Sequence, residues 1–380
     1  MVQVSPNPER QALGDRYLDP DRVDTLLYEA ATGRVPVRGA GYRGPFSGPG
    51  WDSMWTDMSE IVRPTRDGIH GREFISTAVD LGQRPAFLQL DASGTPIAER
   101  PRSLMLPVPF IFDRPALSIR TPELMGVLAG AAEAVQSMSL APIAWAGRDL
   151  AHPASVISIV RPEDRQHLRA LSTPPQIFEI EAWDRAAARE IGVQFPTSLI
   201  LVRVPFGEDL LAWVQEGFRV FHLTADYHGR TQAGLVMDAI RASHESLVSA
   251  GVREQVTLVG SGGIIAPEHL AKAIVAGLDL VALDTALWIA LQAECLGECE
   301  TEEGAHFKLP AIDPEWGVQR LANLSAAWRD QLLEVLGAMG IRDVRRLRGE
   351  IGRAMFQPEL EREAFAGIPG YPDDEAPVGA

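Results

Sequence analysis

The sequence has little that would support a secreted or membrane-spanning protein. Only two cysteines occur in 380 residues; they are too few for a disulfide framework and indicate a reducing compartment. No apolar run reaches the roughly 18 residues that a membrane-spanning helix needs. The first residues have neither the basic start nor the apolar core of a secretory signal. We therefore expect a cytoplasmic protein.

Positive charge is also scarce. The chain has 35 Lys and Arg against 51 Asp and Glu, a net charge of −16. Nucleic acids and anionic membranes both attract basic surfaces, so we expect neither as a partner. With 46% apolar and 23% charged residues the composition is that of a globular protein. The length fits one barrel with an extension, or two ordinary domains.

Regular periodicity is sparse in residues 1–102, which are rich in Pro, Gly and Arg. We interpret this stretch as an N-terminal arm or cap, with one helix over 21–31. Residues 103–295 are predicted to form the main domain, and residues 296–356 a C-terminal helical extension. The tail 357–380, with its Pro, Gly and acidic residues, is predicted to be disordered.

The main domain alternates short apolar strands with amphipathic helices. The predicted strands are 104–112, 141–146, 155–160, 176–182, 198–205, 219–225, 255–259 and 280–284. The predicted helices are 121–136, 163–171, 208–216, 233–250 and 267–276. Eight strands alternating with helices favour a (β/α)8 TIM barrel of the phosphate-binding type. An open, doubly wound parallel sheet is the alternative.

Two turns after the last two strands are typical of a phosphate site in such a barrel. Ser261, Gly262 and Gly263 follow strand seven, where glycines let backbone N–H groups approach an anion closely. Thr285 follows strand eight. Asp284 beside it argues against the site, because a carboxylate repels a phosphate. A tight turn without any ligand is the structural alternative.

The run from Gly262 to Leu287, GGIIAPEHLAKAIVAGLDLVALDTAL, resembles the end of the FMN-binding barrel of glutamate synthases. The turn Phe112-Asp113-Arg114-Pro115-Ala116-Leu117-Ser118 is similar to that family's M-S-F-G-A-L-S turn, and residues 321–349 resemble its closing helices. The resemblance covers about residues 50–350. It implies an oxidoreductase lineage in which Gly262, Gly263 and Thr285 hold the FMN phosphate, with Ser118 near the flavin ring.

Several departures from the family pattern weaken that implication. Glu181 stands where the family has a lysine, which reverses a charge near an anionic ligand. Arg203 replaces a second lysine and keeps the charge without the geometry. The family's G-E-G-G and glycine-rich loops are replaced by residues 146–149 and 224–230. We therefore expect weak FMN binding at best.

The cysteines and histidines give no metal site. The family ligates a three-iron cluster with cysteines spaced C-x5-C-x4-C, whereas this chain has only Cys295 and Cys299, so we expect no iron–sulfur cluster. His222 and His228 bracket the end of strand six and offer acid, base or metal-ligand chemistry, but a structural role is the default. Ser261 has no identifiable base partner.

Two hypotheses follow. The first is a divergent FMN-dependent oxidoreductase related to glutamate synthase, with no identified catalytic residue, to which a protein partner supplies electrons or substrate. The second is a pseudoenzyme, a catalytically inactive barrel that serves as a binding or assembly partner of a redox complex. In either case we predict that the chain alone does not make glutamate. A homo-oligomer is compatible with both.

Overall fold

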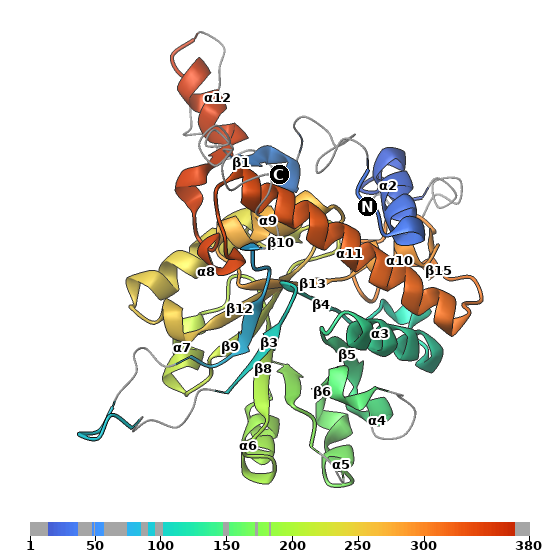
Figure 1. The fold of residues 1–380 in the computed structure, drawn as a ribbon, viewed down its shortest axis with the longest axis vertical. Helices are drawn as coiled ribbons and strands as arrows, with labels where there is room; N and C mark the ends of the chain where they lie inside the picture. The colour runs from blue at the N-terminus through green and yellow to red at the C-terminus, as the bar shows by residue number, and fades with distance from the viewer. Residues whose placement is uncertain are drawn as a thin grey trace, which may run out of the picture.

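A computed structural model describes residues 14–36, 48, 50–56, 74–84, 90–95, 102–146, 152–171, 174–181 and 184–368. Its centre is a closed parallel barrel with the strand order β12-β13-β4-β5-β6-β7-β8-β9 (Figure 1). The barrel strands are β4 (Phe110–Phe112), β5 (Ser139–Pro142), β6 (Val156–Val160), β7 (Ile177–Glu181), β8 (Leu199–Pro205), β9 (Val220–Thr224), β12 (Thr257–Ser261) and β13 (Leu280–Leu283). The prediction of a TIM barrel is confirmed, and the open sheet is excluded.

A helix follows each barrel strand. These helices are α3 (Pro122–Ala134), α4 (Ile143–Ala146), α5 (Arg165–Leu168), α6 (Arg185–Gln194), α7 (Leu210–Gln215), α8 (Val236–Ser249), α9 (Pro267–Ala276) and α10 (Thr285–Ala290). The Thr121 hydroxyl accepts a hydrogen bond from the Leu124 N–H and so caps α3. Gly277 ends α9 at a φ of 134°, a conformation that favours glycine.

Most predicted strands match the observed ones to within one or two residues, and two depart further. The segment predicted as one strand over 104–112 divides into β3 (Ser103–Leu106), which lies outside the barrel, and β4. Pro107 and Pro109 lie between them, and proline cannot donate a ladder hydrogen bond. The strand predicted over 141–146 lies at 139–142, and α4 follows directly, because apolar periodicity does not locate the border between a buried strand and a buried helix.

The N-terminal end of the barrel is closed by a hairpin of β2 (Val79–Gly82) and β3. The Thr257 hydroxyl at the start of β12 donates to the Gly82 carbonyl at 2.7 Å. Arg84, just after β2, lies 3.0 Å from Asp279 at the start of β13. The opposite, C-terminal end therefore remains for a ligand site, as is usual in this fold.

The N-terminal arm and the C-terminal extension pack against each other outside the barrel. The arm helix α2 (Pro20–Thr32) lies beside the long α11 (Pro314–Ala338) (Figure 1). Glu29 of α2 accepts hydrogen bonds from Trp328 Nε1 at 3.0 Å and Gln331 Nε2 at 2.6 Å in α11. β1 (Met54–Thr56) pairs antiparallel with β16 (Ala354–Phe356). The arm and the C-terminal extension therefore support each other.

The C-terminal part departs from its prediction. Residues predicted to begin a disordered tail form α12 (Gln357–Phe365), because Pro358 at the first turn and the Glu-rich run favour a helix. Residues 369–380 lie outside the described residues, as does the 147–149 part of the altered second loop. Among the described helices, none has the length and apolar character needed to cross a bilayer.

Candidate functional site

A cavity of about 300 Å³ lies at the C-terminal end of the barrel. Its walls come from the ends of the strands and from residues 300–303, which lie between β14 (Glu294–Cys295) and β15 (Phe307–Lys308). Two guanidinium groups line it, those of Arg114 and Arg203. The carboxyl groups that line it are Asp113, Glu181, Asp226, Asp284, Glu300, Glu302 and Glu303. The cavity is therefore predominantly acidic.

Arg203 of β8 is the centre of a buried ionic network. Its Nη1 and Nη2 donate to the two carboxylate oxygens of Asp113 at 3.0 and 3.2 Å, and its Nη1 lies 3.4 Å from Glu179 Oε1. Burial alone would raise the pKa of each carboxyl. The charge of Arg203, with that of His222, outweighs burial and holds the pKa of Asp113 and Glu179 below the usual values. Both carboxylates are therefore charged, and they compensate Arg203.

His222 of β9 extends the network to the cavity wall. Its Nδ1 lies 2.7 Å from Glu179 Oε2 and its Nε2 lies 3.2 Å from Ser261 Oγ. The expectation that Ser261 lacks a base partner was therefore wrong, since β9 and β12 are neighbouring strands. A serine, histidine and carboxylate in this order can support nucleophilic catalysis. Here Arg203 also contacts Glu179, so this carboxylate does not serve His222 alone.

The segment between β14 and β15 covers the mouth from the outside. Glu302 accepts from Arg114 Nε at 2.9 Å and also pairs with Arg120. The Tyr227 N–H donates to the Glu300 carbonyl at 2.7 Å. Glu181, which stands where the resemblance implies a lysine, lies 3.2 Å from Arg114 Nη1. The arginines near the rim are thus engaged with the protein's own carboxylates.

The glycine turn after β12 packs against the chain itself. The Tyr17 hydroxyl, from the arm, donates to the Gly263 carbonyl at 2.7 Å. A Cβ on Gly263 would lie 2.8 Å from both that hydroxyl and the Gly229 nitrogen. A Cβ on Gly262 would lie 2.7 Å from the Asp226 carbonyl oxygen. The arm and residues 225–229 therefore approach so closely that both positions require glycine, whether or not a ligand binds there.

The turn after β13 is also internally satisfied. The Asp284 carboxylate accepts a hydrogen bond from the Thr285 N–H and so caps the first turn of α10. Burial, reinforced by nearby Asp113, raises the pKa of Asp284 to about 7. Near neutral pH this carboxyl is therefore divided between its neutral and charged forms. A second anion at this turn would raise that pKa further.

The six predicted cofactor-binding residues do not form one cluster. Arg203 and Ser261 line the cavity. Gly262 and Gly263 lie beneath residues 225–229 and Tyr17, and Thr285 is buried at the start of α10. The Ser118 hydroxyl donates to the Ala305 carbonyl at 2.8 Å and accepts from the Phe307 N–H at 3.1 Å. Ser118 thus fastens the covering segment.

Asp113, Glu179 and Asp15 were not predicted from the sequence as site residues. Glu179 had a usable signal, since a carboxylate inside the apolar run Ile177–Glu181 needs a partner when both faces of the strand are buried. Asp113 follows β4 directly, where barrel sites lie. Asp15 had no signal, because its partner His228 lies 213 positions away.

Comparison with known proteins relates the chain to glutamate synthases. Residues 224–342 match the model of a conserved region in glutamate synthase. The archaeal glutamate synthase [NADPH] of Methanocaldococcus jannaschii is 31% identical over 228 residues, which are 57% of this chain and 43% of that protein. The archaeal-type glutamate synthase [NADPH] of Thermotoga neapolitana is 33% identical over 149 residues, 37% of this chain and 27% of that protein. The matched part thus spans less than half of these relatives.

Solved structures with a similar fold are far more distant in sequence. A flavocytochrome b2 variant with pyruvate bound superimposes with a TM-score of 0.51 at 11% identity, covering 94% of this chain and 89% of that chain. An active chimera of (S)-mandelate dehydrogenase gives a TM-score of 0.50 at 14% identity, covering 88% of this chain and 99% of that chain. These likenesses support the barrel. The sequence matches relate part of this chain to glutamate synthases.

Proposed function

We propose that this chain is a divergent glutamate synthase-type barrel that binds FMN weakly at best and does not make glutamate by itself, so that it acts as a binding or assembly component of a redox system. The observation that carries the proposal is the internal compensation of the barrel mouth. Arg203, the one cation retained from the family's pattern of lysines, is bound to Asp113 through both Nη atoms.

The residues of the mouth do not fit a flavin phosphate. Tyr17 and residues 225–229 cover the glycine turn that would cradle it. At the other turn, the Asp284 carboxylate takes the Thr285 N–H, a donor that the resemblance would assign to the phosphate. A dianion placed there would meet a carboxyl group instead of free donors, which disfavours binding.

The carboxyl groups of the mouth also disfavour binding of a dicarboxylate substrate. Glu181 stands where the resemblance places a lysine, and it lines the cavity with six other carboxyl groups. Two like charges about 4 Å apart repel by about 4 kcal/mol at an effective dielectric of about 20. A 2-oxoglutarate molecule would also have to displace Asp113 from Arg203, which would leave a buried carboxylate without compensation.

The second candidate is an FMN-dependent oxidoreductase that needs a partner. It is favoured by the match over residues 224–342 and by a cavity at the end of the barrel where such enzymes bind their ligands. On this hypothesis a partner that displaces the segment 300–303 would expose Arg114 and Arg203 to an anion.

The absorbance spectrum of the purified chain distinguishes the candidates. The chain incubated with excess FMN should pass through gel filtration without a flavin absorbance band. It should then form no glutamate from 2-oxoglutarate and ammonium with FMN and dithionite-reduced viologen, relative to a heat-denatured sample. Stoichiometric FMN retention, or glutamate above that blank, would refute the proposal and restore the enzyme.

A further inference from the structure

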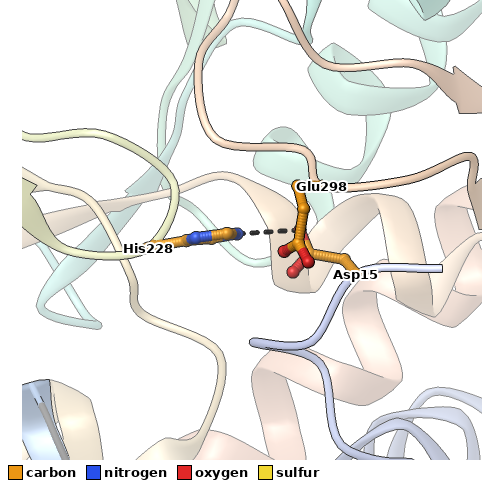
Figure 2. Close-up of side chains that lie close together, drawn as sticks. All are labelled: Asp15, His228 and Glu298. Atoms are coloured by element: carbon orange, nitrogen blue, oxygen red, sulfur yellow. Dashed lines mark hydrogen bonds and ion pairs between the residues drawn. The ribbon is translucent and has the colours of Figure 1, made fainter. Parts of the chain in front are cut away.

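Three ligand-type side chains from distant segments meet at the edge of the barrel mouth. Asp15 comes from the arm, His228 from the loop after β9, and Glu298 from the segment between β14 and β15. Their ligand atoms all lie within 4.8 Å of one another. Figure 2 shows the His228 ring directed at the Asp15 carboxylate, with the Glu298 carboxylate beside it. None of these three residues lines the cavity at the barrel mouth.

Backbone N–H groups hold the Asp15 side chain in place, and a stacked ring holds that of His228. Asp15 Oδ1 accepts from the Tyr17 N–H at 2.8 Å, and Asp15 Oδ2 accepts from the Cys299 N–H at 2.9 Å. The Tyr17 ring stacks on His228 with a centroid distance of 4.9 Å. A carboxylate oxygen has two lone pairs, so Oδ2 keeps an acceptor position after the bond from Cys299. Asp15 and His228 are both buried.

The spacing suits a metal that replaces the proton between His228 and Asp15. His228 Nε2 lies 2.8 Å from Asp15 Oδ2. Two ligand atoms that each lie about 2.1 Å from a tetrahedral zinc ion are about 3.4 Å apart, so the two atoms must separate by about 0.6 Å. A small movement of the His228 ring therefore admits an ion between the two atoms. Glu298 then supplies a third ligand from the more exposed side.

We propose that Asp15, His228 and Glu298 form a binding site for a divalent transition-metal cation of the zinc type. An imidazole nitrogen with two carboxylates suits zinc, whereas calcium and magnesium prefer oxygen ligands alone. Two carboxylates and a neutral imidazole also match a doubly charged cation. Arg16, which lies 3.5 Å from Glu298, has a side chain that is 73% exposed, so it can move aside.

Such an ion would fasten the arm to the mouth. Asp15 lies two residues before Tyr17, which covers the Gly263 turn. Glu298 lies two residues before Glu300, whose carbonyl binds the Tyr227 N–H. The metal would thus tie together three segments that are joined otherwise by hydrogen bonds, and it would stabilise the covered state of the barrel mouth by binding only the folded chain.

The test uses the full chain stripped with a chelator, reloaded with Zn²⁺ and passed through gel filtration, with zinc measured by elemental analysis. Co²⁺ serves as a spectroscopic probe of coordination. We expect about one zinc per chain, a rise in the melting temperature on loading, and loss of both in His228→Gln and in Glu298→Gln. Glu298 is the safer variant, because its side chain is 28% exposed and its replacement should preserve folding.

The matched control is His152→Gln, which removes another histidine paired with a carboxylate, Glu133. This variant should retain the zinc and the thermal shift. The proposal is overturned if the parent chain retains no zinc, or if both His228→Gln and Glu298→Gln retain it. Retention in those two variants with loss in Cys295→Ser would assign the metal to the thiols, and would equally overturn it.

Discussion

Replacing Arg203 with methionine tests whether this guanidinium is a structural ion or a ligand for an anion. The substitution keeps much of the side-chain volume and removes the charge that compensates Asp113 and Glu179, whose side chains are 4% and 1% exposed. Removing one partner of a buried ionic network costs about 3–5 kcal/mol. We expect Arg203→Met to lower the free energy of unfolding by that amount at pH 8.

The effect should depend on pH with a defined sign. In the parent chain folding lowers the pKa of Asp113 and Glu179. Their contribution to the free energy of unfolding is therefore present above the pKa of the unfolded chain, about 4, and it is lost as the pH falls below that value. Without Arg203 burial prevails and raises both pKa values, so the variant loses stability as the pH rises. The difference between the two proteins should therefore be small near pH 4 and largest near pH 8.

Urea unfolding from pH 4 to pH 8 measures the difference. The control is Arg169→Met, which breaks the exposed pair of Arg169 and Glu190, with side chains 79% and 27% exposed, and should cost less than about 1 kcal/mol. A loss below about 1 kcal/mol for Arg203→Met at pH 8, or a more stable variant, would refute the structural role. That result would indicate that Arg203 binds an anionic ligand and that its presence lowers the stability of the unliganded protein.

Three further outcomes are expected. Burial raises the pKa of Glu29 from 4.5 to about 7, so the parent should lose about 3 kcal/mol of unfolding free energy as the pH rises through that interval; urea unfolding of Glu29→Gln should lack this loss. In thermal unfolding, Gly277→Ala should cost about 1–3 kcal/mol of stability, because the new Cβ would lie 2.5 Å from His244. The control Gly192→Ala should not destabilise the protein, because a Cβ there meets open space. Glu302→Gln should speed hydrogen exchange in residues 295–307, since it removes the charge that binds two arginines of the mouth; unchanged exchange would contradict this role.

The barrel was predictable because its signals are local. Each strand is a short apolar run and most of the helices have amphipathic spacing, so α9 was predicted at its observed bounds, 267–276. α6 (Arg185–Gln194) was not predicted, although its apolar residues have helical spacing, with Ala187, Ala188 and Ile191 on the buried face. The split between β3 and β4 depends on two prolines whose effect on pairing is not visible from hydrophobicity.

The site was less predictable because its contacts join distant parts of the chain. The sequence identified Arg203 and Ser261, which do line the cavity, but not their partners. Asp113 and Arg203 are 90 positions apart, and Tyr17 and Gly263 are 246 apart. No spacing rule connects such residues. The glycine turn was therefore interpreted as an anion site, although the glycines also permit close packing of the arm.

The charges of the mouth bear on how this chain diverged from its relatives. A site that binds an anion keeps cations without a full complement of carboxylates, and that arrangement costs stability until the ligand arrives. Here Arg114, Arg120 and Arg203 each pair with a carboxylate of the chain itself. An anionic ligand would have to separate one of these pairs and leave a carboxylate in a partly buried, acidic cavity. This pairing of the mouth's arginines with the chain's own carboxylates is the basis on which we propose a binding or assembly role in place of turnover of an anionic substrate.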